Sequence, residues 1–383
     1  MRILMAVHHY LDPQAGASGS ILEIGQLLAQ RGHAIDYYGF DEAFRGSGPE
    51  RKSQYVRYPL AIARHLSRVG QRYEVVDVSI ADAWLAGMVL SRRSPRPALV
   101  GRSHGLEDLA SDAEMELLRR DGRRPSWRYR VYHRGYRLWE LRRSLRAVDR
   151  SILPNATERD HALSDLKIPA QRISVIPHGV SSAYLAPRQL APAEGPLRLV
   201  FVGNWIPRKG VAVLPTVALE LHERGIDFRL ELLGTVRSAR EVLARFDPRV
   251  RDRLTVLPRF AHDELPNLLA GRHVLLFPSN FEGFGKVLIE AVACGVALVS
   301  TRAGVAGELL DEGAGLQIDP YDPGGPIAAL ARLSADRPQL DALRTRALAL
   351  AARFNWDRVI DLTLDAYNAA RCDARSPARR ALT

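Results

Sequence analysis

Cysteine is scarce in this chain of 383 residues, which contains only Cys294 and Cys372. Two distant cysteines cannot build a disulfide framework, and they lack the spacing of a zinc site. We therefore expect a reducing, cytoplasmic compartment. No run comes near the roughly 18 consecutive apolar residues that a membrane-spanning helix needs. The opening residues 2–7 are followed by two histidines, which is typical of a first strand and not of a signal peptide.

Lysine is also scarce, because only 4 of the 54 basic residues are lysines and the rest are arginines. Arginine occurs in every region, so the net charge of +11 says little by itself about partners. Its distribution says more. Residues 119–150 contain twelve arginines and three acidic residues, and therefore carry most of the excess. The hydrophobic fraction of 46% excludes global disorder, and the length suits two domains.

Short apolar, β-branched runs alternate with helical patterns along the chain, which indicates βαβ units and parallel sheets. The predicted strands are 2–7, 34–38, 73–78, 98–102, 150–153, 173–176, 197–202, 228–233, 254–257, 273–277, 297–300 and 315–318. The predicted helices include 21–31, 82–91, 157–166, 210–224, 263–270, 284–293 and 339–371.

A segment rich in proline, Ser181–Pro196, interrupts this alternation and reads as a linker. We predict an α/β protein with two Rossmann-like, doubly wound parallel sheets that face each other across a cleft. Ligands of such sheets bind beyond the carboxyl ends of the strands. The predicted parts are an N-terminal Rossmann-like domain (1–180), a linker (181–196), a second Rossmann-like domain (197–354), a helix packing back on the first domain (355–371) and a flexible tail (372–383).

The most informative stretch runs from Phe277 to Gly295, where a strand is followed by a glycine-rich turn and then a helix. Backbone N–H groups at such a turn suit an anion or a row of hydroxyls. Glu282 lies in the turn and Glu290 two helical turns further on. Two carboxylates beside an anion-binding turn suit a hydroxyl-rich ligand that carries phosphate. The alternative is an ordinary capped helix with solvated glutamates.

The order of several motifs resembles the GT-B fold glycosyltransferases of family 4, which retain the anomeric configuration. The two glutamates have the spacing E-x7-E of that family, with Gly-Phe-Gly between them. Further matches cover nearly the whole chain: Arg31-Gly-His33, His104-Gly105, Ile176-Pro-His-Gly-Val180, Phe201-Val-Gly203, Arg208-Lys-Gly210 and Arg353-Phe-Asn-Trp356.

The resemblance implies a role for each matching residue. Lys209 would face the donor diphosphate, Glu290 would bind the ribose hydroxyls, and Glu282 would hold the transferred sugar. His104 would contact the donor hexose. The implied catalytic residues are His104, Lys209 and Glu282, and the implied donor-binding residues are Gly16, Ala17, Asn204, Arg208, Lys209, Glu282, Gly283, Phe284, Gly285, Lys286 and Glu290.

Three positions depart from the family pattern. Asn204 stands where the family often has arginine, Ala17 stands where it has the second glycine of a Gly-Gly loop, and Ala297 replaces a proline. The sequence contains no Asp-x-Asp. We therefore expect no metal and no cofactor, with fixed cations such as Lys209 stabilising the charge that develops on the leaving diphosphate.

The arginine-rich segment has an apolar face, formed by Trp127, Val131, Gly135, Leu138, Leu141, Leu145 and Val148. One interpretation is a helix that packs this face on the sheet and exposes its arginines. The other is a surface that attaches to an anionic membrane and brings the enzyme to a lipid-linked acceptor. An acidic polysaccharide or a nucleic acid is a third possible polyanion.

The leading functional hypothesis is a metal-independent hexosyltransferase that uses a UDP- or GDP-linked sugar and a glycan, a lipid-linked molecule or a small metabolite as acceptor. A catalytically weak sugar-nucleotide-binding protein on the same fold is the alternative, and a 2-epimerase is also conceivable. We expect no nucleic-acid partner, because no RNA- or DNA-binding motif accompanies the arginines. Acceptor choice is assigned to two first-domain segments read as loops, 41–53 and 107–126.

Overall fold

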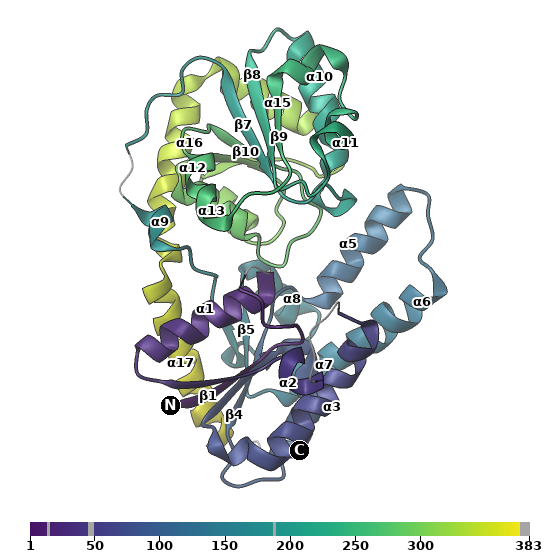
Figure 1. Ribbon diagram of the computed structural model, residues 1–383, viewed down its shortest axis with the longest axis vertical. Coiled ribbons are helices and arrows are strands. Elements are labelled where there is room, and N and C mark those ends of the chain that lie inside the picture. The colour runs from purple at the N-terminus through teal and green to yellow at the C-terminus, as the bar shows by residue number, and fades with distance from the viewer. Residues whose placement is uncertain (14–15, 45–49, 187–188, 376–383) are drawn as a thin grey trace. The chain divides into compact units, whose positions relative to one another are not determined.

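The computed structural model describes residues 1–13, 16–44, 50–186 and 189–375. The chain divides into two compact units, Met1–His178 with Asp357–Thr383, and Gly179–Trp356 (Figure 1). Each unit has one six-stranded sheet whose strands are all parallel, with helices around it. The predicted α/β class with two Rossmann-like sheets is confirmed.

The first sheet has the strand order β2-β1-β3-β4-β5-β6. Its strands are β1 Arg2–Ala6, β2 Ala34–Tyr38, β3 Val75–Ser79, β4 Ala98–Arg102, β5 Arg150–Leu153 and β6 Ile173–Val175. The helices of this unit are α1 Gly16–Gln30, α2 Phe40–Phe44, α3 Lys52–Val69, α4 Ala83–Leu90, α5 Glu107–Arg120, α6 Trp127–Tyr129, a π-helix Arg130–Arg137, α7 Leu138–Ala147, α8 Ala156–Ser164 and α17 Trp356–Arg375.

The second sheet has the order β12-β11-β10-β7-β8-β9. Its strands are β7 Leu197–Val202, β8 Phe228–Leu233, β9 Leu254–Leu257, β10 Val274–Phe277, β11 Ala297–Ser300 and β12 Gly315–Gln317. The helices are α9 Ser182–Leu185, α10 Leu214–Glu223, α11 Ala239–Leu243, α12 Leu265–Leu269, α13 Lys286–Ala293, α14 Ala306–Asp311, α15 Gly324–Ala335 and α16 Arg337–Leu350.

Both faces of the second sheet are buried, which explains why its strands are apolar at successive positions. Val200 and Val202 of β7 belong to a core with α13 and α16, while Leu199 and Phe201 belong to a separate core with α10 and α15. Successive side chains of a strand point to opposite faces, so one strand contributes to both cores. The carboxyl ends of these strands are thereby held in rigid positions.

The C-terminal helix α17 packs on the first unit. Tyr367 donates a hydrogen bond of 2.6 Å to the Asp77 carboxylate in β3, and Arg102 in β4 donates to the same oxygen at 2.7 Å. All three side chains are buried. Nearer its start, α17 presents Asp357 to Arg31 at 2.8 Å.

Several predicted boundaries differ in the structure. The helical stretch 339–371 is interrupted between α16 and α17 by a 3-10 turn, Ala351–Phe354. The segment 107–126 is not a loop, because Glu107–Arg120 forms α5. In the segment 41–53, residues 41–44 belong to α2 and α3 begins at Lys52, while 45–49 lie outside the described residues.

The expected linker and tail also contain regular structure. Within 181–196, residues 182–185 form α9, and Ala193 packs into the core of the second unit. Residues 372–375 continue α17, whereas 376–383 lie outside the described residues. Cys294 is buried and Cys372 is exposed, and neither forms a disulfide. In the described ranges, no helix is both long enough and apolar enough to cross a membrane.

Candidate active site

Two loops at the carboxyl ends of β7 and β10 form the centre of the site in the second unit. Gly210 has a φ of +68°, and a Cβ built there would lie 1.9 Å from the carbonyl oxygen of Pro278. Only glycine allows this approach. The Asn280 N–H donates to the Arg208 carbonyl at 2.9 Å, so the loop after β7 and the loop after β10 are bound together.

Lys209 and Glu282 meet where these loops join. The Lys209 ammonium donates to Glu282 Oε1 at 2.6 Å, and the Ser279 hydroxyl donates to the same oxygen at 2.6 Å. The Arg208 guanidinium lies 3.8 Å from the other carboxylate oxygen and donates to the Phe281 carbonyl at 2.9 Å. Both partners of the lysine pair are largely buried, with side-chain exposures of 16% and 10%.

The helix α13 begins beside this pair. Its N-cap is Gly285, which has a φ of +84° and no side chain to cap the first N–H groups. Gly304 supports the turn, because a Cβ there would lie 2.2 Å from the Phe284 carbonyl oxygen. Such a helix start attracts anions through its N–H groups and its dipole. The predicted residues Gly283, Phe284, Gly285 and Lys286 therefore lie together at a start of this kind.

Glu290 lies one turn further along α13 and is buried, with 3% exposure. Its Oε1 lies 3.4 Å from Nε2 of His262, whose side chain is 57% exposed. Partial desolvation of the ring and the nearby Lys286 hold the pKa of His262 below its usual value. The sequence prediction gave no role to Ser279 or His262. Ser279 lies within the stretch 277–295, three residues before Glu282, whereas only the folded chain brings His262 to Glu290.

Asn204 follows β7 directly and is exposed. It lies on the same loop as Arg208 and Lys209, but its side chain makes no hydrogen bond to any described residue. The two predicted residues Gly16 and Ala17 belong to the first unit, where they form the start of α1 and not a loop. The close approach there is made by Gly19, whose added Cβ would lie 2.5 Å from the Pro13 carbonyl oxygen.

His104 follows β4 in the first unit, and both of its ring nitrogens are buried without a hydrogen-bond partner among the described residues. Burial, with His178 and Arg102 nearby, holds its pKa well below the usual value. The imidazole is therefore neutral, with one nitrogen able to donate and the other to accept. A buried polar ring with no protein partner is suited to binding a ligand.

The loop that carries His104 is fixed by Glu158 of α8. Its carboxyl group bonds the Ser103 hydroxyl at 2.5 Å and accepts from the Leu106 N–H at 3.2 Å. Burial raises the pKa of Glu158 to about 8. This residue is therefore a positioning residue for the segment 103–106.

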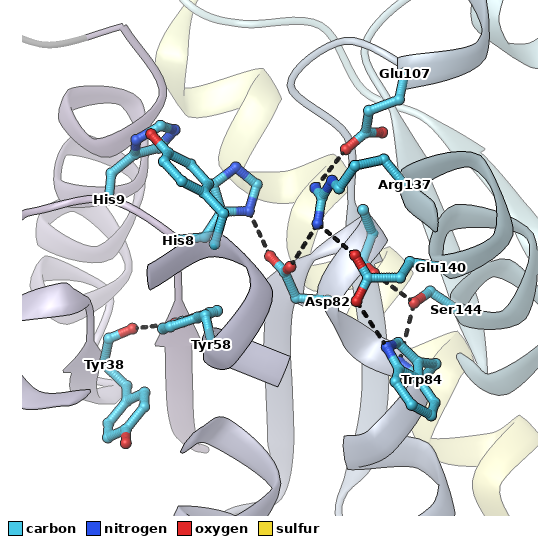
Figure 2. Close-up of polar contacts among 12 residues, drawn as sticks. His8, His9, Tyr38, Tyr58, Asp82, Trp84, Glu107, Arg137, Glu140 and Ser144 are labelled. Atoms are coloured by element: carbon cyan, nitrogen blue, oxygen red, sulfur yellow. Dashed lines mark hydrogen bonds and ion pairs between the residues drawn. The ribbon is translucent and has the colours of Figure 1, made fainter. Parts of the chain in front are cut away.

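A buried network lies at the carboxyl ends of β1 and β3, near the start of α7 (Figure 2). His8 Nδ1 contacts the Asp82 carboxylate, whose other oxygen lies 3.4 Å from Arg137. Arg137 also pairs with Glu140 and Glu107, both at 2.8 Å. Burial lowers the pKa of His8, but Asp82 raises it more, so the net shift is upward.

The network corrects the interpretation of the arginine-rich segment. The interpretation that the segment exposes its arginines fails for Arg137, whose side chain is 8% exposed and compensated by three carboxylates. The apolar face is also divided. Leu138 and Leu141 are buried, whereas Trp127 and Val131 are 70% and 63% exposed. The segment therefore packs on the first unit mainly from Arg137 onward, whereas the apolar side chains of Trp127 and Val131 lie in solvent.

No group of three or more His, Cys, Asp or Glu side chains that could hold a metal occurs in the described ranges. The cations that the site offers for a phosphate are Lys209, Arg208 and Lys286, together with the start of α13. The carboxylates Glu282 and Glu290 are acceptors for hydroxyl groups. This combination suits a sugar linked to a phosphate.

Comparisons with known proteins follow the same division of the chain. Residues 15–184 match the family model described as Glycosyltransferase Family 4, and residues 196–336 match the model described as Glycosyl transferases group 1. The chain is 29% identical over 353 residues to a D-inositol 3-phosphate glycosyltransferase of Arthrobacter sp. (strain FB24), covering 85% of this chain and 79% of that protein.

A second D-inositol 3-phosphate glycosyltransferase, from Acidothermus cellulolyticus, is 29% identical over 254 residues, which is 62% of this chain. The match spans only 56% of that relative's own length. A third, from Segniliparus rotundus, is 29% identical over 60% of this chain and 55% of its own length.

Solved structures share the fold at low identity. Sucrose-phosphate synthase from Thermosynechococcus elongatus matches with a TM-score of 0.74 at 19% identity, covering 96% of this chain and 98% of that one. HepE of Anabaena, solved in complex with UDP-glucose, matches with a TM-score of 0.65 at 16% identity, covering 96% and 98%. WaaG, a glycosyltransferase involved in lipopolysaccharide biosynthesis, matches with a TM-score of 0.68 at 18% identity, covering 95% and 98%.

Proposed function

This chain belongs to the family 4 glycosyltransferases of group 1 and has the GT-B fold, and from that premise we propose that it transfers a hexose from a nucleotide diphosphate sugar with retention of configuration. The observation that carries the proposal is the pair of Lys209 and Glu282 beside the start of α13. Lys209 would stabilise the charge that develops on the leaving diphosphate. Glu282 would bind sugar hydroxyls, and the buried Glu290 would bind those of the ribose.

We propose UDP as the nucleotide of the sugar donor, with GDP as the alternative. The HepE structures that share the fold contain UDP and UDP-glucose, which supports testing UDP first. A thermal-shift screen against UDP, GDP, ADP and their sugars identifies the base, because a ligand that binds only the folded state raises its Tm. A shift with a nucleoside diphosphate that Glu290→Ala abolishes would support the assignment. Equal Tm shifts with all three nucleoside diphosphates, in both wild type and Glu290→Ala, would contradict it.

Donor turnover tests the reaction. Wild-type protein should slowly hydrolyse the sugar nucleotide that it binds, and Lys209→Ala or Glu282→Gln should abolish this activity. The anomeric configuration of the released or transferred sugar, read by NMR, tests retention. Activity that survives EDTA would support the proposal that cationic side chains replace a metal, and loss with rescue by Mg²⁺ would overturn that part.

The acceptor is proposed as a hydroxyl-rich molecule, either a glycan, a lipid-linked molecule or a small metabolite. D-inositol 3-phosphate appears in the names of the sequence relatives, so it is the first small acceptor to test. His8 and His9 follow β1 and lie against the Tyr55 ring, with centroid distances of 5.5 and 5.9 Å. These rings at the carboxyl end of the first sheet support an acceptor position there.

A catalytically weak sugar-nucleotide-binding protein is the second candidate, and Asn204 is the observation that favours it. The loop after β7 has an uncharged side chain where the family often has a cation. Tight binding of a sugar nucleotide by calorimetry, with no hydrolysis and no transfer to any acceptor tried, would favour this reading over the enzyme.

We further propose that the arginine-rich segment makes a peripheral contact with an anionic membrane through its exposed first part. Trp127 and Val131 are exposed apolar side chains, and the Arg128 guanidinium lies 5.6 Å from the centre of the Trp127 ring. Apolar side chains flanked by arginines suit an anionic lipid surface, where each cation contributes about 1 kcal/mol.

Sedimentation with vesicles tests this contact. The protein should bind phosphatidylglycerol vesicles at low salt and dissociate from them at high salt. It should not bind phosphatidylcholine vesicles. Trp127→Ser with Val131→Ser should weaken binding. Val56→Ser with Leu60→Ser on α3, where both residues are also exposed, is the matched control. Equal binding of both double variants would contradict the assignment.

A further inference from the structure

A pocket of about 940 Å³ opens in the first unit at the amino ends of β3 and β4. It is lined by Tyr73 and Glu74 before β3, and by the segment from Ser91 to Leu99 that leads into β4. His8, Asp82 and His104 follow the carboxyl ends of strands in the same sheet. The pocket is therefore distinct from the site described above.

Arginines from three elements surround the pocket. Arg92, Arg93 and Arg96 come from the segment before β4, Arg143 and Arg146 come from the exposed side of α7, and Arg371 and Arg375 come from the end of α17. Glu74 is the only acidic residue among the described residues that line it. Such an excess of fixed cations in a concave site raises the local concentration of anions.

Some of these arginines form ion pairs with carboxylates and others do not. Arg96 forms a bidentate pair with buried Asp149 at 2.7 and 2.8 Å, and Arg371 pairs with Glu74 at 2.6 Å. In the described part of the chain, Arg92, Arg143 and Arg146 have no ion-pair partner. The paired arginines are held in position, and the unpaired ones keep their hydrogen-bond donors for a ligand.

Helix α4 and the end of α7 contribute apolar residues to the pocket lining. A Cβ added at Gly87 of α4 would lie 2.7 Å from the Ala147 Cβ, so the glycine lets α4 approach the end of α7 closely. Trp84 and Met88 on the same helix line the pocket, and Met88 is 46% exposed. A flat or apolar group can therefore lie on these side chains while the arginines bind charge around it.

We propose that this pocket binds a phosphate-bearing organic anion. The guanidinium group matches the geometry of phosphate oxygens and forms paired hydrogen bonds to them. The volume falls in the range of sites for small ligands. A soluble nucleotide-like molecule and a lipid headgroup share this chemistry, and the experiment separates these two sources.

The pocket and the buried network of Figure 2 share two helices. Helix α4 begins after Asp82, and α7 begins after Arg137, and both end at the pocket. Trp84 belongs to both, because it lines the pocket and its Nε1 donates to Glu140 at 3.2 Å. Trp84 is therefore a natural fluorescent reporter of ligand binding, and Trp84→Phe identifies its share of the signal.

Calorimetry with ATP and tripolyphosphate tests the site in the full chain. Both probes should bind wild-type protein, and a binding event should remain in Lys209→Ala, which weakens the proposed donor site of the other unit and leaves the pocket intact. Arg92→Gln with Arg146→Gln should weaken binding at least about tenfold, since charge-assisted contacts to phosphate are lost. Arg240→Gln with Arg245→Gln, which removes two exposed arginines from the second unit, should bind as wild type does.

Binding to phosphatidylglycerol vesicles is measured as a second experiment. Binding of vesicles but of neither soluble probe, with the same dependence on Arg92 and Arg146, identifies a lipid phosphate as the source. Equal binding of all probes by wild type and Arg92→Gln/Arg146→Gln overturns the proposal, as does loss of the soluble probes in Lys209→Ala.

Hydrogen exchange of the wild-type protein covers the case in which the double variant fails to fold. ATP should protect amides in the segments 84–99 and 143–147, and protection confined to the second unit would overturn the proposal. The proposed transferase is judged separately, because anion binding that depends on Arg92 would remain even if the wild type turned over no donor.

Discussion

Lys209 donates a hydrogen bond of 2.6 Å to Glu282, although the two residues lie 73 positions apart in the chain. The pair compensates one positive and one negative charge that are both largely buried. The lysine has three donors, so it can hold the glutamate and still reach a phosphate. A bound donor would thus meet a cation and an acceptor that are already positioned.

Removing either member of this pair should reduce donor turnover. We expect Lys209→Ala to lower kcat by about 10²- to 10³-fold, the size of effect seen when one charge-stabilising donor is removed from an active site. Steady-state hydrolysis of the preferred sugar nucleotide measures it. Arg240→Ala, an exposed cation elsewhere in the same unit, should leave kcat unchanged. A fall in both variants would contradict a specific role.

Asn204→Arg should strengthen donor binding. The side chain is exposed on the loop that carries Lys209, so a longer cation can reach solvent or phosphate without entering the core. One added charge-assisted contact corresponds to about a tenfold lower Kd for the nucleotide diphosphate. Calorimetry with UDP measures the change, and Asn204→Gln, which adds length without charge, is the control. An equal gain in both variants would exclude charge as the cause.

Glu158→Gln should change how stability depends on pH. Burial raises the pKa of Glu158 from 4.5 to about 8. Between these values the folded state keeps a proton that the unfolded chain has lost, so the free energy of unfolding falls as pH rises. Glutamine cannot titrate, and it retains hydrogen-bond partners for Ser103 and Leu106.

Urea denaturation at pH 5 and pH 8 measures this effect. The loss of stability between the two pH values should be clearly smaller in Glu158→Gln than in wild type. Glu223→Gln removes an exposed carboxylate and should behave as wild type does. An unchanged loss in Glu158→Gln would show that other groups cause the pH dependence.

Arg137→Met should destabilise the first unit, because Asp82, Glu107 and Glu140 would lose their shared cation. Breaking a buried ion pair on one side costs about 3–5 kcal/mol. Chemical denaturation measures the change in unfolding free energy. Arg130→Met, at an exposed position of the same segment, should change it by no more than about 0.5 kcal/mol.

Local patterns predicted the elements of the candidate site around α13 well. The apolar strand ending at Phe277, the glycines after it and the helix with Glu290 follow one another in the chain, so spacing alone places them at one strand end. Helices α3, α5 and α15 were not predicted. Helix α3 contains Pro59 and α15 begins with Gly324, Gly325 and Pro326, which disfavour a helix locally, and α5 was assigned to a loop. The cytoplasmic compartment stays a prediction.

Residues that meet through the fold were beyond sequence reasoning. His262, in the turn before α12, contacts Glu290 of α13, and Arg137 contacts Asp82, which lies 55 positions earlier in the chain. Sequence periodicity predicts which face of a helix is apolar, but it does not predict which charged residue has a buried partner. Arg137 could therefore not be distinguished from its exposed neighbours. Only the contacts of Arg137 with Asp82, Glu107 and Glu140 in the folded chain reveal the difference.

The sequence by itself determined the two parallel sheets, the glycine turns and the family, because these depend on short-range patterning and on motifs in a fixed order. Only the tertiary structure decided which charges are paired. It neutralised Arg137, joined Lys209 to Glu282 and left Arg92, Arg143 and Arg146 facing a pocket. The physical reason is that desolvation and partner distance are properties of the packed chain, and they separate arginines that the sequence cannot distinguish.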